Sequence, residues 1–193
     1  VGGVDEQVQP GLVGVFGGDG MRGPGARVSW LAPTERFLEA TLGLQNANGE
    51  TMTSFLANDE VYAERPLGGR AFTARETRSF GDFVWSGRLA TGFDLGTDHS
   101  MAFGVSGAFG PNATGEGAAT TIYGADFVWK WQPAGAERGT PFLKVEAEIV
   151  GRDFETAAQV DASVPSTPVD LPATTLHDLG GFVQGTWGFA AGW

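Results

Sequence analysis

The sequence predicts an all-β protein, a transmembrane antiparallel up-and-down β-barrel of which about seven strands of a larger barrel are present. Three observations support this fold class. Apolar and polar side chains alternate with a period of two in several segments, the links between these segments alternate between short and long, and aromatic residues gather near the predicted strand ends. No apolar stretch is long enough for a transmembrane helix, which needs about 18 or more residues.

The alternation defines the strands in chain order. The first is short, near Arg27–Leu31, and the second is the clearest, because Leu38 and Leu42 share one face while Glu39 and Thr41 share the other. Most of the segments approach the roughly 9 to 11 residues that a tilted membrane-crossing strand needs. The predicted strands cover residues 27–31, 38–45, 82–93, 100–109, 123–131, 143–149 and 183–193. Residues 27–193 are therefore predicted to form the barrel segment, and residues 1–26 a glycine-rich loop or N-terminal extension.

The links indicate a membrane barrel more strongly than the strands do. Residues 32–36, 96–99 and 132–140 form short links, and residues 46–80, 110–120 and 152–178 form longer ones. If neighbouring strands are antiparallel, all short links lie at one end of the sheet and all long ones at the other. Outer-membrane barrels have this arrangement of periplasmic turns and extracellular loops.

The two faces of the predicted strands differ in chemistry. Aromatic side chains near the strand ends are expected to form a lipid-facing girdle at each membrane interface. Charged side chains share the opposite parity and are expected to face a water-filled lumen, where they tune which solutes pass. The expected girdle residues are Trp30, Trp85, Phe93, Phe103, Tyr123, Trp129 and Trp131, and the expected lumen residues are Glu39, Arg88, Asp126, Lys130, Lys144, Glu146, Glu148 and Arg152. Pairing of Glu146 and Glu148 with Lys130 and Asp126 on the neighbouring strand is a further expectation.

Several segments together resemble a known family. Arg27–Pro33 followed by Phe37–Gly43, and then Tyr123–Pro133, are similar to the hairpin and strand motifs of porin-like bacterial outer-membrane proteins, often described as zinc-regulated or TonB-dependent receptor-like. Val145–Glu148 and Gly181–Gln184 match the strands that follow. The resemblance implies a bacterial outer-membrane location, contact with lipid and lipopolysaccharide, and small solutes in the lumen.

Members of that family have longer barrels, and bacterial barrels have even strand numbers. Seven antiparallel strands cannot close simply, because the first and last would meet in parallel. We therefore expect a partial chain, or partner strands in a homo-oligomer or a partner protein.

Composition and motifs argue against several other functions. The net charge of -11 with only 12 Lys and Arg disfavours a nucleic-acid partner, and the chain has no Cys for a thiolate site. Gly18–Gly23 has the glycine spacing of a dinucleotide-binding loop, but Pro24 follows where a helix would have to start. His99 and His177 are expected at opposite ends of the barrel, so no metal site is expected. No G-x-S-x-G motif occurs, and we expect neither catalysis nor a cofactor.

Three functions remain open from the sequence. The first is a porin-like channel for passive or weakly selective passage of small solutes through a mixed-charge lumen. The second is an outer-membrane receptor whose long acidic loops, at residues 58–60 and 160–174, bind a ligand. The third is a soluble β-barrel binding module, in which the same apolar face points inward and the charged face is solvated.

Overall fold

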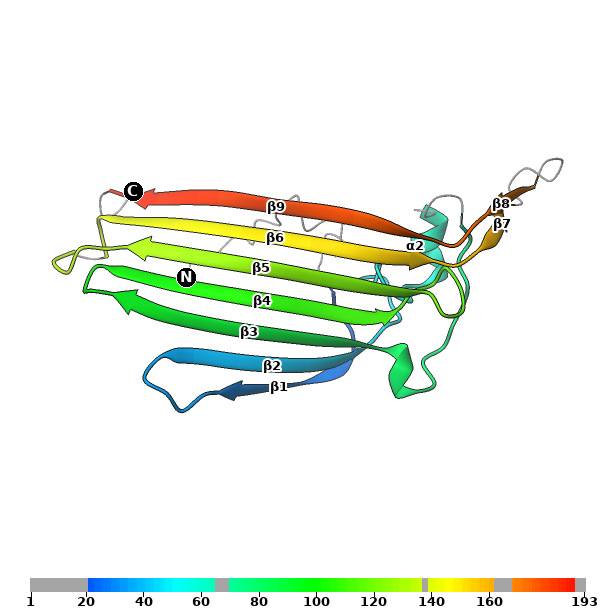
Figure 1. Cartoon of the computed structure of the whole chain (residues 1–193), viewed down its shortest axis with the longest axis horizontal. Coiled ribbons are helices and arrows are strands. Elements are labelled where there is room, and N and C mark those ends of the chain that lie inside the picture. The colour runs from blue at the N-terminus through cyan, green and yellow to red at the C-terminus, as the bar shows by residue number, and fades with distance from the viewer. Residues whose placement is uncertain (1–20, 65–69, 137–138, 162–167, 190–193) are drawn as a thin grey trace.

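The computed structural model of the chain describes residues 21–64, 70–136, 139–161 and 168–189. It contains one seven-stranded antiparallel sheet whose order, β1-β2-β3-β4-β5-β6-β9, follows the chain (Figure 1). The sheet strands are β1 (Gly25–Leu31), β2 (Phe37–Asn46), β3 (Phe83–Leu95), β4 (His99–Pro111), β5 (Ala119–Trp131), β6 (Phe142–Thr156) and β9 (Thr174–Gly188). The prediction of an all-β fold with antiparallel neighbours in chain order is confirmed.

Smaller elements lie in the links at one end of the sheet. The helix α2 (Asp59–Glu64) and the 3-10 helix η1 (Phe80–Asp82) lie between β2 and β3. The strands β7 (Gln159–Asp161) and β8 (Val169–Leu171) form a separate two-stranded ribbon between β6 and β9. The links at this end, which we call the loop end, lie on the right of Figure 1, and the turns at the opposite end, the turn end, lie on the left.

The sequence predicts that short and long links alternate, and this prediction is wrong for one pair of neighbouring links. The β4–β5 link, residues 112–118, is shorter than the β5–β6 link, residues 132–141. Strands β4 and β5 extend further toward the loop end than their side-chain alternation indicates, and β6 and β9 do the same up to Thr156 and Thr174. The reason is that backbone pairing continues past the point where apolar and polar side chains stop alternating.

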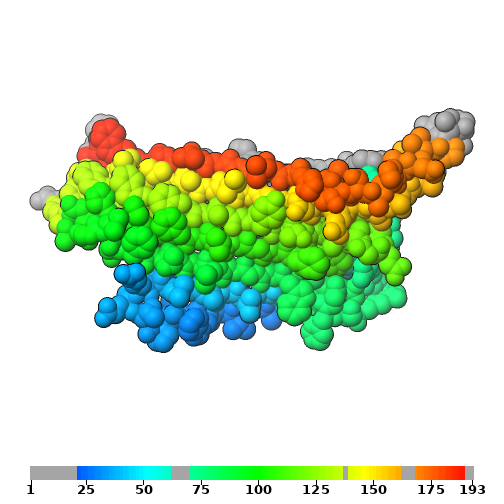
Figure 2. Space-filling view, viewed as in Figure 1, coloured from blue at the N-terminus to red at the C-terminus, as the bar shows by residue number. Residues whose placement is uncertain are grey.

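The seven-stranded sheet is open and not closed into a barrel, as expected for seven antiparallel strands. Over the described residues, β1 pairs only with β2 and β9 pairs only with β6, so both are edge strands. Six successive antiparallel pairings leave β1 and β9 running in the same direction. Figure 2 shows the strands side by side, from β1 at the bottom to β9 at the top.

The register aligns side chains of one kind across the sheet. Trp85 on β3 lies opposite Leu44 on β2 and Phe109 on β4, whereas Arg88 lies opposite Thr41 and Ser106. Because successive side chains in a strand point to opposite sides, this register produces one apolar and one polar face. The apolar face, defined by the parity of Trp85, carries most of the large exposed hydrophobic residues of the sheet.

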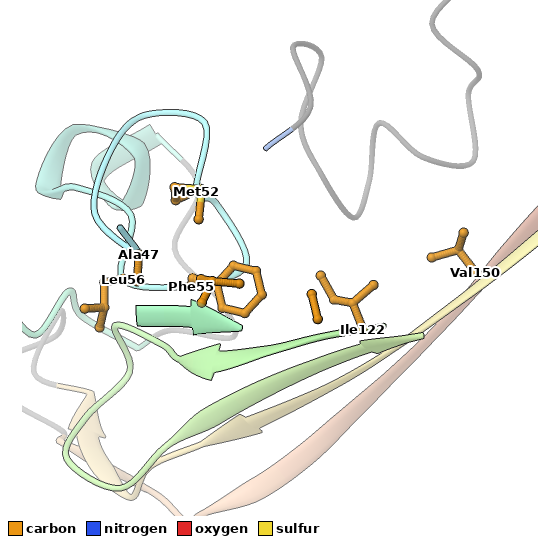
Figure 3. Close-up of a cluster of buried hydrophobic side chains, with 8 residues drawn as sticks. Ala47, Met52, Phe55, Leu56, Ile122 and Val150 are labelled. Atoms are coloured by element: carbon orange, nitrogen blue, oxygen red, sulfur yellow. The ribbon is translucent and has the colours of Figure 1, made fainter. Parts of the chain in front are cut away.

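A folded loop covers the loop end of the polar face. Residues 47–58, which we call the plug segment, follow β2 and are closed on themselves by a bond from the Gly49 amide to the Ala57 carbonyl, 3.0 Å long. The buried cluster contains Ala47, Met52, Phe55 and Leu56 from the plug segment, and Val84, Ala108, Ile122 and Val150 from four strands of the sheet (Figure 3). These strand residues have the parity of the polar face, so the described part of the chain has its main apolar core on that side.

Replacing Phe55 by alanine tests this core. Phe55 is 0% exposed, so the Phe55→Ala substitution should lower the free energy of unfolding by about 3 kcal/mol. Denaturant unfolding followed by Trp fluorescence measures the change. Phe80→Ala is the matched control, because Phe80 is 72% exposed and its loss should change stability by about 0.5 kcal/mol or less. Equal effects of the two substitutions would contradict the packing described here.

Candidate functional site

The polar face of the sheet is hollowed between the plug segment and the turn end. A recess of about 480 Å³ is lined by residues from β1 to β6, among them Arg27, Glu39, Arg88 and Glu148. Six adjacent strands line a single recess only if the sheet curves toward this face. All eight residues predicted to face a lumen share this parity: Glu39, Arg88, Asp126, Lys130, Lys144, Glu146, Glu148 and Arg152.

The wall of the recess carries an ion pair that spans three strands and includes the lining residue Arg88. The guanidinium of Arg88 on β3 donates two bonds to the carboxylate of Asp126 on β5, of 2.6 Å and 2.9 Å. The strand between them, β4, has Gly104 at this position, and a Cβ there would collide with both the guanidinium and the carboxylate. Gly104 therefore allows the pair to lie flat against the wall instead of projecting into the recess.

Carboxylates flank this ion pair along one row of the sheet. Asp126 lies opposite Glu148 on β6, and Glu39 on β2 lies opposite Ala90 in the same row. Three carboxylates therefore share this row, while Arg88 lies in the neighbouring row and Arg27 lines the same recess, so the recess carries both signs of charge. Small residues on β4, namely Ala102, Gly104 and Ser106, separate the charged groups of β3 from those of β5.

The predicted pairing of charges between β5 and β6 is wrong. Asp126 lies opposite Glu148, and Lys130 lies opposite Lys144, so like charges face each other across the two strands. The Lys144 ammonium instead pairs with Glu146, two residues along its own strand, at 2.7 Å. The sequence contains the right charges, but their partners depend on a register that alternation alone leaves undetermined.

Arg152 has a different environment from the other predicted lumen residues. The sequence places it at the start of a long loop, whereas the structure places it inside β6, with a side chain only 12% exposed. Its guanidinium bonds Asp178 on β9 and donates to Ser54 Oγ of the plug segment at 2.8 Å. Arg152 therefore connects the wall to the plug segment.

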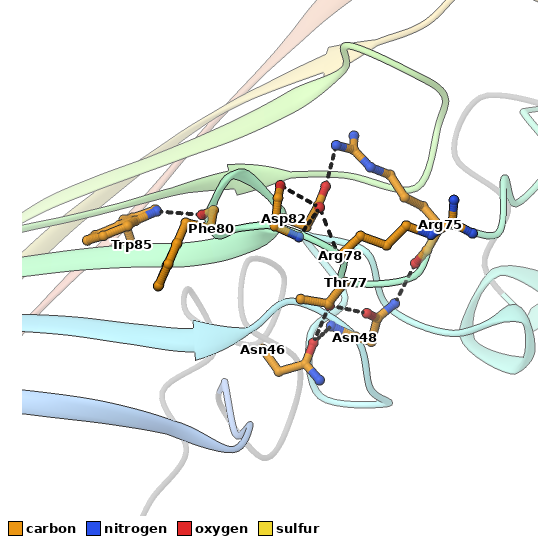
Figure 4. Close-up of polar contacts among 9 residues, drawn as sticks. Asn46, Asn48, Arg75, Thr77, Arg78, Phe80, Asp82 and Trp85 are labelled. Carbon is orange, nitrogen blue, oxygen red and sulfur yellow. Dashed lines mark hydrogen bonds and ion pairs between the residues drawn. The ribbon is translucent and has the colours of Figure 1, made fainter.

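A second polar cluster holds the link between the plug segment and β3 (Figure 4). The Asp82 carboxylate accepts bonds from the Ser79 hydroxyl at 2.9 Å and from the Arg78 amide at 3.1 Å, and it pairs with Arg75. These bonds lower the pKa of Asp82 from 3.8 to about 2. The bond from the Ser79 hydroxyl is the largest cause of this shift. Asn48 is tied to the same link by a bond from its amide group to the Arg75 carbonyl, 3.0 Å long.

The seven predicted girdle residues all lie on the apolar face, most of them near an end of the sheet. Toward the turn end lie Trp30, Phe93, Trp129 and Trp131, and toward the loop end lies Trp85. Tyr123 and Phe103 lie further from the ends of their strands, and Phe103 contacts Phe93 and Phe127. Trp187 on β9 joins the turn-end row but was not among the predicted girdle residues. On the same face, in the row of Trp85, His177 pairs with Asp153 at 2.7 Å.

The two histidines of the chain lie at opposite ends of the sheet. His99 begins β4 at the turn end and His177 lies near the start of β9 at the loop end, so the two imidazoles are far apart. In the part of the chain that the structure describes, no group of three or more His, Asp or Glu side chains is arranged to hold a metal ion. Within the same residues, no helix has the length and apolar character to cross a membrane. Residues 1–20, which include most of the predicted N-terminal extension, lie outside the described residues.

Comparison of the chain with protein-family models, with curated proteins and with solved structures finds no match. The resemblance to porin-like outer-membrane proteins therefore stays a prediction from the sequence motifs.

Substitution of Gly104 tests the ion pair that crosses β4. An alanine Cβ would displace the Arg88 guanidinium or the Asp126 carboxylate, so Gly104→Ala should lower the free energy of unfolding by about 1 kcal/mol, the size expected of a partly exposed pair. Thermal or denaturant unfolding measures this change. Gly185→Ala on β9 is the control, because a Cβ there meets no atom within 4 Å. An unchanged stability of Gly104→Ala would show that the pair does not need an empty position on β4.

Acid titration tests the Asp82 cluster. Because the pKa of Asp82 is lower in the folded protein than in the unfolded chain, its stabilising effect is complete above about pH 4 and is lost as the pH falls toward about 2. The stability difference between the wild type and Asp82→Asn should therefore be largest near neutral pH and shrink across this window. Denaturant midpoints of the two proteins at several pH values provide the measurement. A difference that stays constant from pH 7 to pH 2 would rule out this role for the Asp82 carboxylate.

Proposed function

We propose that the chain forms part of the wall of a porin-like channel in a bacterial outer membrane, through which small solutes pass without a chemical reaction. The observation that carries this proposal is the division of the sheet into two faces. The apolar face is exposed along all seven strands, with Val28 71%, Leu89 49% and Val183 78% exposed. The polar face bears the charged recess. A wall between lipid and water needs this division.

The dimensions of the apolar face fit a membrane. Tyr123 and Trp131 on β5 are separated by about 27 Å along the strand, at about 3.4 Å per residue. A strand tilt of about 40° reduces this to about 20 Å along the membrane normal, close to the apolar band of about 25 Å in outer-membrane barrels. The polar pair of His177 and Asp153 lies on the loop-end side of this band, where lipid headgroups and lipopolysaccharide would be the partners.

Closure of the channel requires further strands. Because β1 and β9 run in the same direction, an odd number of additional strands between them is needed for an all-antiparallel barrel. We propose that these strands come from further segments of the same protein, from a partner protein or from a second copy. The recess then becomes one side of the lumen.

The location of the buried core argues against a soluble binding module. In such a module the apolar face would be covered, but the plug segment packs on the polar face and leaves the apolar face exposed. A receptor is the second candidate, because the links at the loop end are joined by many hydrogen bonds. Gln159, for example, bonds both the amide and the carbonyl group of Ala71 across the loop end. A ligand-binding surface built from loops needs such rigidity.

Planar-bilayer recordings of the full-length protein test the channel. The proposal expects discrete conductance steps that are absent when detergent alone is added. Heat-modifiable mobility on gels, measured in parallel, reports whether the protein is folded. A folded protein that yields no conductance would overturn the channel and leave the receptor. A protein that is monodisperse in buffer without detergent would overturn both membrane functions.

A further inference from the structure

We propose that the plug segment, residues 47–58, is a fixed constriction at the loop end of the pore, and that Arg152 is the positioning residue that holds it. This inference rests on the proposed channel, because a constriction has a function only in a pore. It assigns a role to a loop that the sequence does not single out, and it implies that only small solutes pass.

The burial of the plug segment indicates a fixed element instead of a mobile lid. Met52 and Phe55 are both 0% exposed, and they pack with Val84 and Ile122 of the sheet. A lid that opened readily would expose these side chains to water at each opening, which is unfavourable in proportion to the apolar area exposed. The plug segment is therefore expected to stay on the polar face.

Polar contacts tie the plug segment to the strands of the wall around Ser54. The Thr120 hydroxyl on β5 donates to the Ser54 carbonyl, and the Arg152 guanidinium on β6 donates to Ser54 Oγ at 2.8 Å. The neighbouring Phe55 carbonyl accepts a bond from the Ala113 amide at 3.2 Å. The β4–β5 link, β5 and β6 thus each donate a hydrogen bond to Ser54 or Phe55 of the plug segment.

Arg152 is suited to this role because its guanidinium has several donors in a fixed geometry. One side of the guanidinium is held by Asp178 on β9, at 2.6 Å, and another nitrogen reaches Ser54. Hydrogen bonds from charged groups are stronger than neutral ones, and the low exposure of Arg152 limits competition from water. Loss of Arg152 should therefore loosen the plug segment more than loss of a neutral donor.

Cysteine labelling tests the position of the plug segment without relying on conductance, because the chain contains no native Cys. In the full-length protein, a Met52→Cys probe should react slowly with a maleimide. Adding Arg152→Gln should raise its labelling rate roughly ten-fold or more, as expected for the loss of a charged hydrogen bond. A Glu50→Cys probe at an exposed position should react quickly in both backgrounds and serves as the control.

Two further substitutions separate positioning by Arg152 from a general loss of stability. Ser54→Ala removes only the plug acceptor, so it should raise labelling of Met52→Cys as Arg152→Gln does. Asp178→Asn removes the other partner of Arg152 and should raise it less. Equal labelling in all three variants, or slow labelling in Arg152→Gln, would overturn the role of Arg152.

Conductance of the same variants distinguishes this inference from the proposed function. If the inference holds, Arg152→Gln and Ser54→Ala should each increase the single-channel conductance or its fluctuations. Arg78→Gln is the matched control, because the Arg78 side chain is 80% exposed in the link before β3, and it should not change the fluctuations. Faster labelling with no conductance from any folded protein would contradict the channel while the tie between Arg152 and the plug segment stands. Faster labelling with unchanged conductance would overturn the constriction alone.

Discussion

The register of the seven strands is the constraint on which the rest of the structure depends. In a pleated strand, successive side chains point to opposite faces, so a shift of one residue would exchange the two faces of that strand. Each of the six strand pairs keeps Arg88, Asp126 and Glu148 on one side of the sheet. The exposed apolar face, the charged recess and the seat of the plug segment all follow from that alignment.

The plug segment explains four of the apolar residues that lie on the polar face. Val84, Ala108, Ile122 and Val150 are apolar, although they belong to the face that bears the charges. They lie where the plug segment covers the sheet, so they contact Met52, Phe55 and Leu56 instead of water. Toward the turn end, where the plug segment does not reach, the same parity is occupied by Asp126, Lys130 and Lys144. The composition of the polar face therefore changes at the edge of the plug segment.

The sequence was sufficient for the strands and their faces because both depend on a local, period-two pattern. The partners of the charged residues depend on register, which the period-two pattern does not determine. Lys130 was therefore predicted to pair with a carboxylate, whereas it lies opposite Lys144. Link lengths were misjudged where Thr and Gly residues continue a strand without alternating in hydrophobicity, as at the ends of β6 and β9. The plug segment was missed because its contacts join residues far apart in the chain. The apolar residues of polar parity, such as Ile122, were the available signal for it.

The edges of the sheet connect the fold with the proposed function. Side chains on the apolar face of the edge strand β9, such as Leu179 at 74% and Val183 at 78%, are exposed, and β9 has a neighbour on one side only. In a membrane, the unpaired backbone groups of such an edge would each be unfavourable by several kcal/mol. Stable insertion of the apolar face therefore requires both β1 and β9 to be paired with further strands. The same requirement explains why conductance is a meaningful test only when both edges are paired, because an open sheet encloses no lumen.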